Sequence, residues 1–474
     1  MVRVRRSVVG MAPDDPALTW YRAAVQAMLA KPADDPRSWR YQGAVHGVPG
    51  GVATPASARG FWDQCNHQNW FFLPWHRAYL AVFEAIVASV IEDLGGPADW
   101  ALPFWDYSAR AGGVPDPRLM HAAFLGRALP NGQPNALWSR RAAVPNGDFN
   151  LTDDVVSLGA LKFDNFTSAR IGVPSGFGGP DSMANPGPDN GGLEGVPHNL
   201  IHTRVGGRDG FMSFPDTAAL DPIFWLHHAN IDRLWEVWRN RAGVSGSPQD
   251  PRWMSTVDFR FKGANGATLT LKSRDVLDTT ALLHGYSYDG VPVAHEPAAG
   301  GVGVMGVGGQ DDEPQPMLLG ANAGPLELGD QTRTEVAIDA GIVPFGVTAG
   351  AKTYLSLENV TGAGNPGDYD VYVDLPGDGR EPIRVGKLTV FGLERASDPD
   401  RMHGGGGLNQ AFDITDAAAT LGLRPQDAGR LAVTFRRDAP APSDDGVPEA
   451  LADYAPRRAA APSIKVGRVS LYQA

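Results

Sequence analysis

Two predicted helices, each with a histidine in an apolar setting, constrain the fold of this chain most strongly. From 74 to 94, apolar side chains recur every three or four residues, and Gly95-Gly96-Pro97 ends the run. A second helix is expected to begin at Asp221-Pro222, and its apolar stripe includes His228. A buried imidazole needs a hydrogen-bond partner or a metal, because burying an unpaired polar group costs free energy. The pair therefore indicates a helical core built around a polar centre.

The chain divides by composition into two parts. Its 474 residues suggest two or three domains at about 150 residues each. All 12 tryptophans lie before residue 290, whereas 291–328 is rich in glycine, proline and alanine. Beyond 329, apolar and polar residues alternate as they do in strands. We expect a mainly α, loop-rich helical bundle over 1–290, a linker over 291–328, and an antiparallel β-sandwich or barrel over 329–474.

Charge and cysteine content disfavour several classes of protein. The formal net charge of −12 disfavours nucleic acid or an anionic membrane as a partner, and no apolar run approaches the ~18 residues of a membrane span. The single cysteine, Cys65, permits neither an intramolecular disulfide nor a cysteine-based zinc cluster. Residues 1–6 are basic, but the apolar segment and cleavage site of an export signal do not follow. We therefore expect a cytoplasmic location, with export alongside a partner or with a removed signal as the alternative.

Histidines are concentrated in the N-terminal part, near aromatic or helical segments. Seven of the eleven lie there: His46, His67, His76, His198, His202, His227 and His228. His198 and His202 follow Pro197, and a spacing of four places both imidazoles on one helix face, where they could bind one metal. Such a pair alone is more often a surface feature, and no glutamate follows His198 as in zinc proteases. Ligation by imidazoles without cysteine or carboxylate suits copper.

Two longer motifs carry a resemblance to a known family. The segment from His67 to Glu84, HQNWFFLPWHRAYLAVFE, closely resembles the first copper motif of the tyrosinase family. The segment from Asp221 to Asp232, DPIFWLHHANID, is similar to the second. The resemblance extends from about Val2 to Tyr288. Beyond it, the chain loosely resembles the additional domain of longer members, including some bacterial polyphenol oxidases.

The resemblance implies a type-3 centre of two copper ions with three histidines each. The first copper would bind His46, His67 and His76, and the second His198, His202 and His228. His228 is chosen over His227 because the family's ligand is followed four residues later by an aspartate, here Asp232. Asp232 itself could accept a hydrogen bond from a ligand imidazole, or form a surface pair with Arg233.

Further residues acquire roles from the same resemblance. Glu194 and Asn199 match family residues that hold a water thought to deprotonate phenols. The alternative is that Glu194 is an acid favoured by the helix dipole and Asn199 a solvated helix residue. Cys65-Asn66-His67 resembles a family sequence in which the sulfur bonds covalently to the imidazole, although a buried apolar cysteine is the other reading. Substrate access is expected near Met212 to Pro215.

The implied activity is oxidation of small phenols by O2, the chemistry that leads to melanin. Monophenols would be hydroxylated to catechols, and catechols oxidised to o-quinones. The alternatives are a catechol or o-aminophenol oxidase without monophenolase activity, a hemocyanin-like O2 carrier, and a C-terminal domain that is an independent binding module. A copper-delivery partner is a further expectation. The C-terminal domain is expected to cover the copper cleft and keep the enzyme latent, or else only to stabilise the core.

Overall fold

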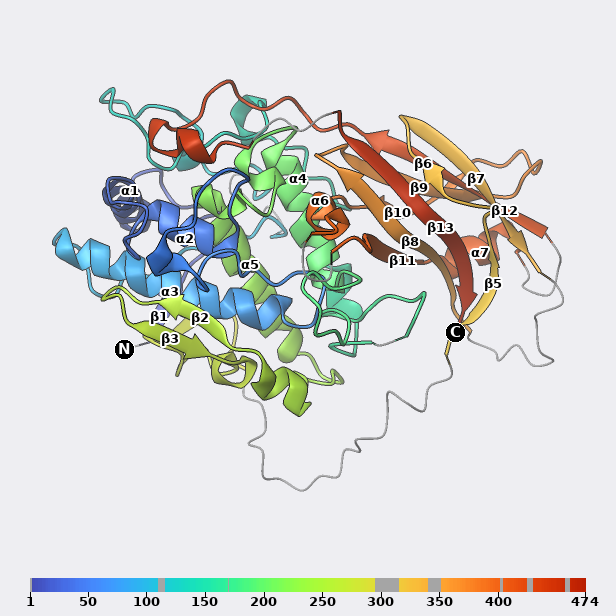
Figure 1. Cartoon of the computed structure of the whole chain (residues 1–474), viewed down its shortest axis with the longest axis horizontal. Helices are drawn as coiled ribbons and strands as arrows, with labels where there is room; N and C mark the ends of the chain where they lie inside the picture. The colour runs from blue at the N-terminus through green and yellow to red at the C-terminus, as the bar shows by residue number, and fades with distance from the viewer. Residues whose placement is uncertain are drawn as a thin grey trace.

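Helices α3 (Phe72–Asp93) and α5 (Pro222–Arg239) form the centre of the N-terminal half, and they correspond to the two helices expected from the sequence. The Asp221 side chain accepts a hydrogen bond from the backbone N–H of Ile223, so it caps α5 as predicted. This computed structural model describes residues 2–109, 116–168, 170–294, 315–339, 351–400, 404–423, 429–456 and 461–474. Helices α1 (Pro16–Leu29), α2 (Trp39–His46) and α4 (Leu200–Gly206) pack around the central pair (Figure 1).

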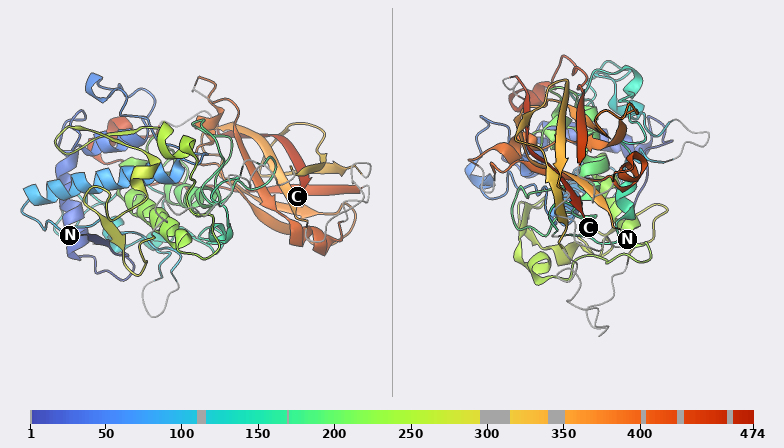
Figure 2. Two further views of the ribbon diagram at one scale, coloured as in Figure 1. Left: turned by 90° about the horizontal axis from the view of Figure 1, so that it is seen from below. Right: turned by 90° about the vertical axis from the view of Figure 1, so that its right-hand side faces the viewer.

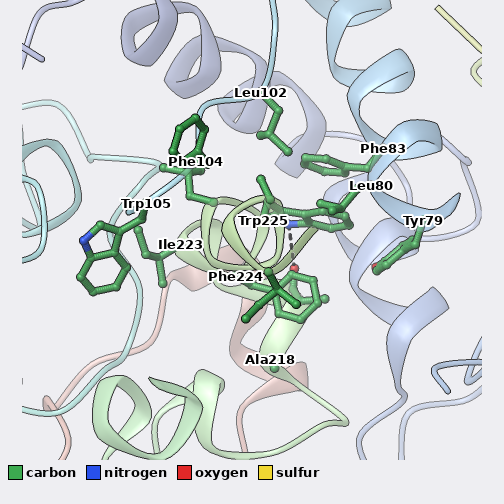
Figure 3. Close-up of a cluster of buried hydrophobic side chains, with 14 of the residues drawn as sticks. Tyr79, Leu80, Phe83, Leu102, Phe104, Trp105, Ala218, Ile223, Phe224 and Trp225 are labelled. Atoms are coloured by element: carbon green, nitrogen blue, oxygen red, sulfur yellow. Dashed lines mark hydrogen bonds between the residues drawn. The ribbon is translucent and has the colours of Figure 1, made fainter. Parts of the chain in front are cut away.

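Aromatic side chains pack α3 against α5 (Figure 3). The rings of Phe83 on α3 and Trp225 on α5 stack with centroids 3.3 Å apart, and Tyr79 lies 4.7 Å from the same indole. Trp39 of α2 contacts both Phe83 and Trp225 edge-on. Because large rings interdigitate in one arrangement, these contacts fix how each helix is rotated about its axis. That rotation decides which side chains of α3 and α5 face each other.

Short strands and long loops complete the N-terminal half. Strand β1 (Arg3–Arg5) pairs in parallel with β4 (Tyr286–Tyr288), and β2 (Phe259–Lys262) pairs antiparallel with β3 (Thr268–Leu271). The stretch between α3 and α4 consists mostly of loops and single helical turns, which confirms the expected loop-rich helical core. No helix in the described ranges is both long enough and apolar enough to cross a bilayer.

The C-terminal half is a nine-stranded antiparallel sheet that curls into a nearly closed barrel (Figure 2). Its strands are β5 (Met317–Ala321), β6 (Leu326–Glu327), β7 (Gln331–Ile338), β8 (Thr353–Ala363), β9 (Asp368–Asp374), β10 (Ile383–Leu388), β11 (Leu408–Asp413), β12 (Gly429–Asp438) and β13 (Ser463–Gln473). The order is β10-β9-β12-β7-β5-β13-β8-β11, with β6 beside β13. At the closing edge, Gly386 of β10 lies against the ring of Phe412 of β11. Two short helices, α6 (Leu393–Ser397) and α7 (Thr415–Leu421), accompany the sheet. The β-rich prediction is confirmed.

The two halves have separate hydrophobic cores, but the chain does not divide cleanly between them. Phe391, Leu451 and Tyr454 come from the C-terminal half and belong to the core of the helical half. Figure 1 shows the segment after β12 crossing over the helical half. Of the linker predicted over 291–328, residues 295–314 lie outside the described residues. The described remainder includes β5 and β6, which pair into the barrel sheet and so begin before the predicted start at 329. The boundary at 290 stays a prediction.

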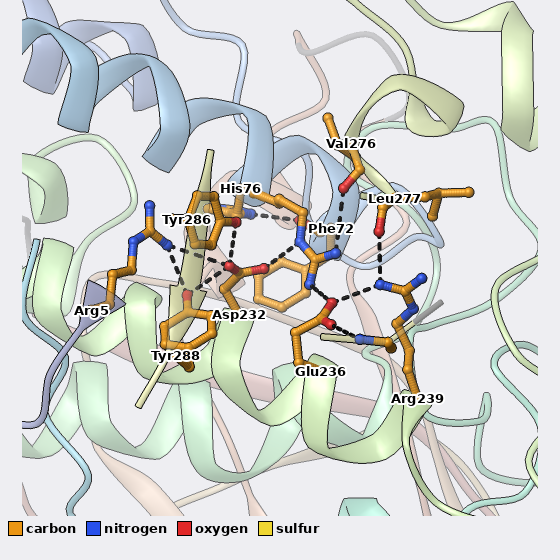
Figure 4. A network of polar contacts seen from close by, with 12 residues as sticks. Arg5, Phe72, His76, Asp232, Glu236, Arg239, Val276, Leu277, Tyr286 and Tyr288 are labelled. Atoms are coloured by element: carbon orange, nitrogen blue, oxygen red, sulfur yellow. Dashed lines mark hydrogen bonds and ion pairs between the residues drawn. The ribbon is translucent and has the colours of Figure 1, made fainter. Parts of the chain in front are cut away.

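A buried ionic network joins the first strand, both central helices and the end of the helical half (Figure 4). Asp232 on α5 accepts hydrogen bonds from Arg77 at 2.5 Å and from the hydroxyls of Tyr286 and Tyr288 at 2.6 Å each. Burial would raise the pKa of Asp232, but Arg77 and Arg5 outweigh it and hold that pKa below its usual value. The sequence predicted that Asp232 bonds either to a ligand imidazole or to Arg233 on the surface. Both predictions are therefore wrong.

Replacing Asp232 with alanine tests this network. Arg77 and Arg5 would keep their buried charges and lose a carboxylate partner, so we expect the free energy of unfolding to fall by about 3–5 kcal/mol. The control is Asp153→Ala, because Asp153 pairs with Arg118 on the surface and its side chain is 92% exposed. Denaturant unfolding followed by tryptophan fluorescence measures both variants. If the free energy of unfolding falls by an equally small amount in both variants, a structural role for the network is contradicted.

Candidate metal centre

Six predicted site histidines come from six successive segments of the helical half and meet in the interior. His46 ends α2, His76 lies in the first turns of α3, His202 is on α4, and His228 is on α5. His67 precedes α3, and His198 lies in a π-helical turn over Glu194–Asn199. All six are buried, with at most 5% of any residue exposed. The central helices place His76 and His228 face to face, with stacked rings 4.5 Å apart.

The six imidazoles form two groups of three. In the first group, the centroid distances are 5.3 Å for His46–His67, 5.5 Å for His46–His76 and 5.2 Å for His67–His76. In the second group, they are 4.5 Å for His198–His202, 4.9 Å for His198–His228 and 5.5 Å for His202–His228. His76 and His228, at 4.5 Å, connect the two groups. The assignment of three ligands to each ion stays a prediction.

Hydrogen bonds hold most of these rings by one nitrogen and leave the other pointing inward. The Nδ1 atoms of His46, His76 and His202 lie 2.7, 2.8 and 2.9 Å from the carbonyl oxygens of Pro215, Phe72 and Met212. A carbonyl only accepts, so each Nδ1 carries the proton and each Nε2 keeps a free lone pair. The Nε2 atoms of His202 and His228 approach each other to 3.3 Å.

Inward-pointing nitrogens without partners are the strongest sign of a metal. In the described part of the chain, the buried Nε2 atoms of four of these histidines have no hydrogen-bond partner: His46, His67, His76 and His198. Burial lowers the pKa of His46 and of His198 to about 3, so both rings are neutral, the form in which imidazole binds metals. Native proteins rarely leave such atoms unsatisfied, and convergent neutral imidazoles fit copper.

Two further residues, His227 and Cys65, lie close enough to these histidines to be possible metal ligands. His227 belongs to a group with His198, His202 and His228 whose donor atoms all lie within 4.8 Å of one another. Its Nδ1 lies 3.3 Å from the hydroxyl of Tyr107, and its buried Nε2 has no hydrogen-bond partner among the described residues. The spacing of residues along the helix could not tell whether His227 or His228 is the ligand. The stacking of His228 on His76 favours His228.

Cys65 is buried beside the first group, and its sulfur lies within 4.8 Å of the donor nitrogens of His46 and His67. Arg395 of α6, from the C-terminal half, donates a hydrogen bond to this sulfur at 2.9 Å. The cysteine is therefore close enough to His67 for the covalent link that the resemblance implies, and the link itself stays a prediction.

Glu194 and Asn199 lie beside the histidine groups and are both almost fully buried. The two carboxylate oxygens of Glu194 accept from the backbone N–H of Gln68 at 2.9 and 3.0 Å, and burial raises the pKa of this carboxyl. Asn199 Oδ1 accepts from Nδ1 of His198 at 2.8 Å. Asn199 is therefore not a solvated helix residue. Glu194 is the first residue of the π-helical turn, so its alternative role as an acid at a helix start stays open. The pairing of Glu194 with a backbone N–H next to His67 had no signal in the sequence.

An aromatic residue of the C-terminal half covers the histidines. The ring of Phe391 stacks on His202 with centroids 4.0 Å apart and lies 5.6 Å from His198 and 5.9 Å from His67. Two residues earlier, the hydroxyl of Thr389 lies 3.4 Å from the amide nitrogen of Asn199. Sequence reasoning expected a covering domain but could not name the residue, because the contact depends on how the two halves dock.

The loop at Met212 to Pro215 was expected to gate substrate. The carbonyls of Met212 and Pro215 are the acceptors that hold His202 and His46, so this loop supports two of the predicted ligands. Gly392, next to Phe391, packs against Pro215 and the side-chain amide of Gln68. The gating role of the loop stays a prediction.

Comparisons with known proteins agree with this geometry. A sequence profile described as the common central domain of tyrosinase matches residues 36–152 and 164–241, and one described as a domain of unknown function matches 315–474. A tyrosinase of Hahella sp. (strain CCB-MM4) is 37% identical over 451 residues, which cover 89% of this chain and 92% of that protein. A chloroplastic polyphenol oxidase of Malus domestica is 32% identical over 58% of this chain, which spans about half (46%) of that relative.

Solved structures share the fold over the full chain. Latent apple tyrosinase superposes with a TM-score of 0.61 at 22% identity, covering 100% of this chain and 97% of that one. Latent aurone synthase from a natural source gives 0.60 at 19% identity, covering 100% and 89%. Both likenesses therefore include the C-terminal barrel as well as the helical half.

Adjacent histidines on α5 offer a matched test of the metal site. We expect His228→Ala to lose bound copper, because its ring belongs to the second group and stacks on His76 of the first. His227→Ala should keep copper, since that ring is held by Tyr107. Copper per chain, measured by mass spectrometry of the dialysed protein, separates the two. Full copper in His228→Ala, or its loss only in His227→Ala, would overturn the choice of ligand.

Proposed function

The chain belongs to the tyrosinase family of copper-dependent phenol oxidases, and we propose that it both hydroxylates monophenols to catechols and oxidises catechols to o-quinones. Its cofactor is a pair of copper ions, and its substrates are O2 and small phenols. The observation that carries the monophenol half of the proposal is the buried Glu194 carboxylate, fixed against the segment that bears His67. A carboxylate at that place could take the proton that a monophenol must lose before it is hydroxylated.

We assign the copper ligands from the geometry of the two histidine groups. His46, His67 and His76 would hold one ion, and His198, His202 and His228 the other. Two bound copper ions supply the two-electron redox chemistry with O2 that phenol oxidation requires. The protein contributes neutral imidazoles aimed inward, backbone carbonyls that fix their tautomers, and a dry aromatic surrounding.

Glu194 and Asn199 would manage the proton of an incoming monophenol. The Gln68 N–H orients the Glu194 carboxylate, and burial raises its pKa, which makes the ionised carboxylate a stronger base. Asn199 orients His198 through its side-chain oxygen, and its amide nitrogen donates to Asn190 at 3.3 Å and to the Thr389 hydroxyl at 3.4 Å. Displacement of Thr389 would free this amide for a water. A water held between the carboxylate and this amide could take the phenolic proton and pass it to Glu194.

Glu194→Gln tests this role because the amide keeps the shape and loses the base. We expect monophenol hydroxylation to fall by about 10²–10⁴-fold, with a much smaller effect on catechol oxidation, since only the monophenol must lose its proton before hydroxylation. Turnover of tyramine and of 4-methylcatechol on one preparation gives the ratio. An equal loss on both substrates would mean that Glu194 is structural.

Activity of the unmodified chain separates the alternatives. Turnover of catechol or an o-aminophenol without any monophenol hydroxylation would select the narrower oxidase. Reversible O2 binding without turnover of any phenol would select an oxygen carrier.

We also propose that the enzyme is latent as folded. Phe391 occupies the space over His202, His198 and His67 that an aromatic substrate would need. Thr389 places its hydroxyl on the amide of Asn199, where the proposed water would sit. The segment 389–391 thus fills both the ring position and the water position, so a phenol must displace it before it can react.

Phe391→Ala should therefore raise catechol turnover while copper per chain stays the same. The control is Tyr372→Ala, which removes a half-buried aromatic ring from strand β9 of the same domain and should leave turnover unchanged. Initial rates at saturating catechol, divided by copper content, measure the effect. Unchanged turnover in Phe391→Ala would refute the plug.

A further inference from the structure

Residues 439–456, here named the strap, leave the barrel after β12 and run back over the helical half (Figure 1). The strap contains a short 3-10 helix over Glu449–Tyr454. Leu451 and Tyr454 are buried in the helical core, with 2% and 6% of their surface exposed. The strap is thus packed as a part of the helical half, although it belongs to the C-terminal domain in sequence.

The first residues of the strap bond to the helical half mainly through the backbone. Ala441 O accepts from Arg208 N at 2.9 Å, and Pro442 O accepts from Ala143 N at 2.7 Å. Asp444 N donates to Arg141 O at 2.8 Å. These bonds hold the strap between two loops of the helical half.

Ser443 adds a side-chain contact to the loop that follows α4. Its hydroxyl accepts from the backbone N–H of Asp209 at 2.9 Å and donates to the carbonyl of Gly206 at 3.0 Å. Next to it, Gly207 has φ of +66°, and a Cβ there would lie 2.7 Å from Ala441 O. Only glycine allows the strap to approach so closely.

The clamped loop carries the carbonyls that orient two predicted copper ligands. Met212 O holds Nδ1 of His202, and Pro215 O holds Nδ1 of His46. Within the loop, Ser213 Oγ donates to Gly207 O at 2.5 Å, so the clamped end is tied to the end with the carbonyls. A contact path therefore leads from Ser443 through Gly207 and Ser213 to one ligand of each copper.

We infer that the strap is a positioning element of the copper site. The C-terminal domain then has two opposite effects in two separate segments: 389–391 covers the metal centre, whereas 439–456 holds the loop that orients His46 and His202. Removing the whole domain would remove both. The inference rests on the proposed ligand set and does not depend on which phenols are oxidised.

The test is the copper affinity of full-length variants, measured by competition with a chelator and without phenol. Ser443→Ala should weaken copper binding by up to about tenfold, the lower end of the loss seen when a direct partner of a metal ligand is removed, because Ser443 acts on the ligands through the loop. Ser443→Thr keeps the hydroxyl and should restore it. Leu451→Ala loosens the far anchor and should also weaken binding. Thr415→Val is the control, because the Thr415 hydroxyl at the start of α7 likewise makes two hydrogen bonds, but both within the C-terminal domain.

The thermal midpoint of each apoprotein shows whether it remains folded. A lower midpoint with unchanged copper affinity in both Ser443→Ala and Leu451→Ala would overturn the inference, because the strap would then only stabilise the fold. If the chain binds two copper ions tightly but oxidises no phenol, the proposed function is contradicted. The inference about the strap is then unaffected.

Discussion

The structure depends on the cost of burying neutral imidazoles whose inner nitrogens have no protein partner. In the described residues, four such nitrogens lie in one dry interior, and two more meet there at 3.3 Å. Each would be destabilising alone, since an unsatisfied buried polar atom costs about 1–3 kcal/mol. Two bound metal ions would coordinate these nitrogens, and the coordination would offset the cost of burying them. The fold must therefore hold the rings in place firmly enough that they meet the metal and not each other.

Three kinds of contact meet this demand, and each comes from a different level of the structure. Interlocked rings such as Phe83 and Trp225 set the rotation of α3 and α5. Backbone carbonyls fix the tautomers of individual histidines. The Asp232 network ties the two helices to strands β1 and β4, one residue from His76 and one helical turn from His228. The strap extends the second kind of contact, because it holds the loop that carries two of those carbonyls.

Much of this arrangement can be predicted from local sequence patterns. The remainder depends on contacts between segments that are far apart in the sequence. The N-cap at Asp221 and the apolar spacing of α3 depend on neighbours a few residues away, so they could be predicted. The grouping of the histidines followed from motifs that repeat within a family. Phe391, Ser443 and the partners of Asp232 depend on segments more than fifty residues apart meeting in space, and no local pattern records such contacts. For the same reason, a domain boundary drawn from composition did not show that Leu451 belongs to the helical core.

Anomalous X-ray diffraction at the copper edge, on crystals of the copper-loaded full-length chain, tests the central claim most directly. The account predicts two peaks, each about 2.0–2.1 Å from three histidine nitrogens, the distance usual for imidazole on a metal of this size. One peak should lie among His46, His67 and His76, and the other among His198, His202 and His228. A single peak, or a peak ligated by His227 or by the sulfur of Cys65, would contradict it.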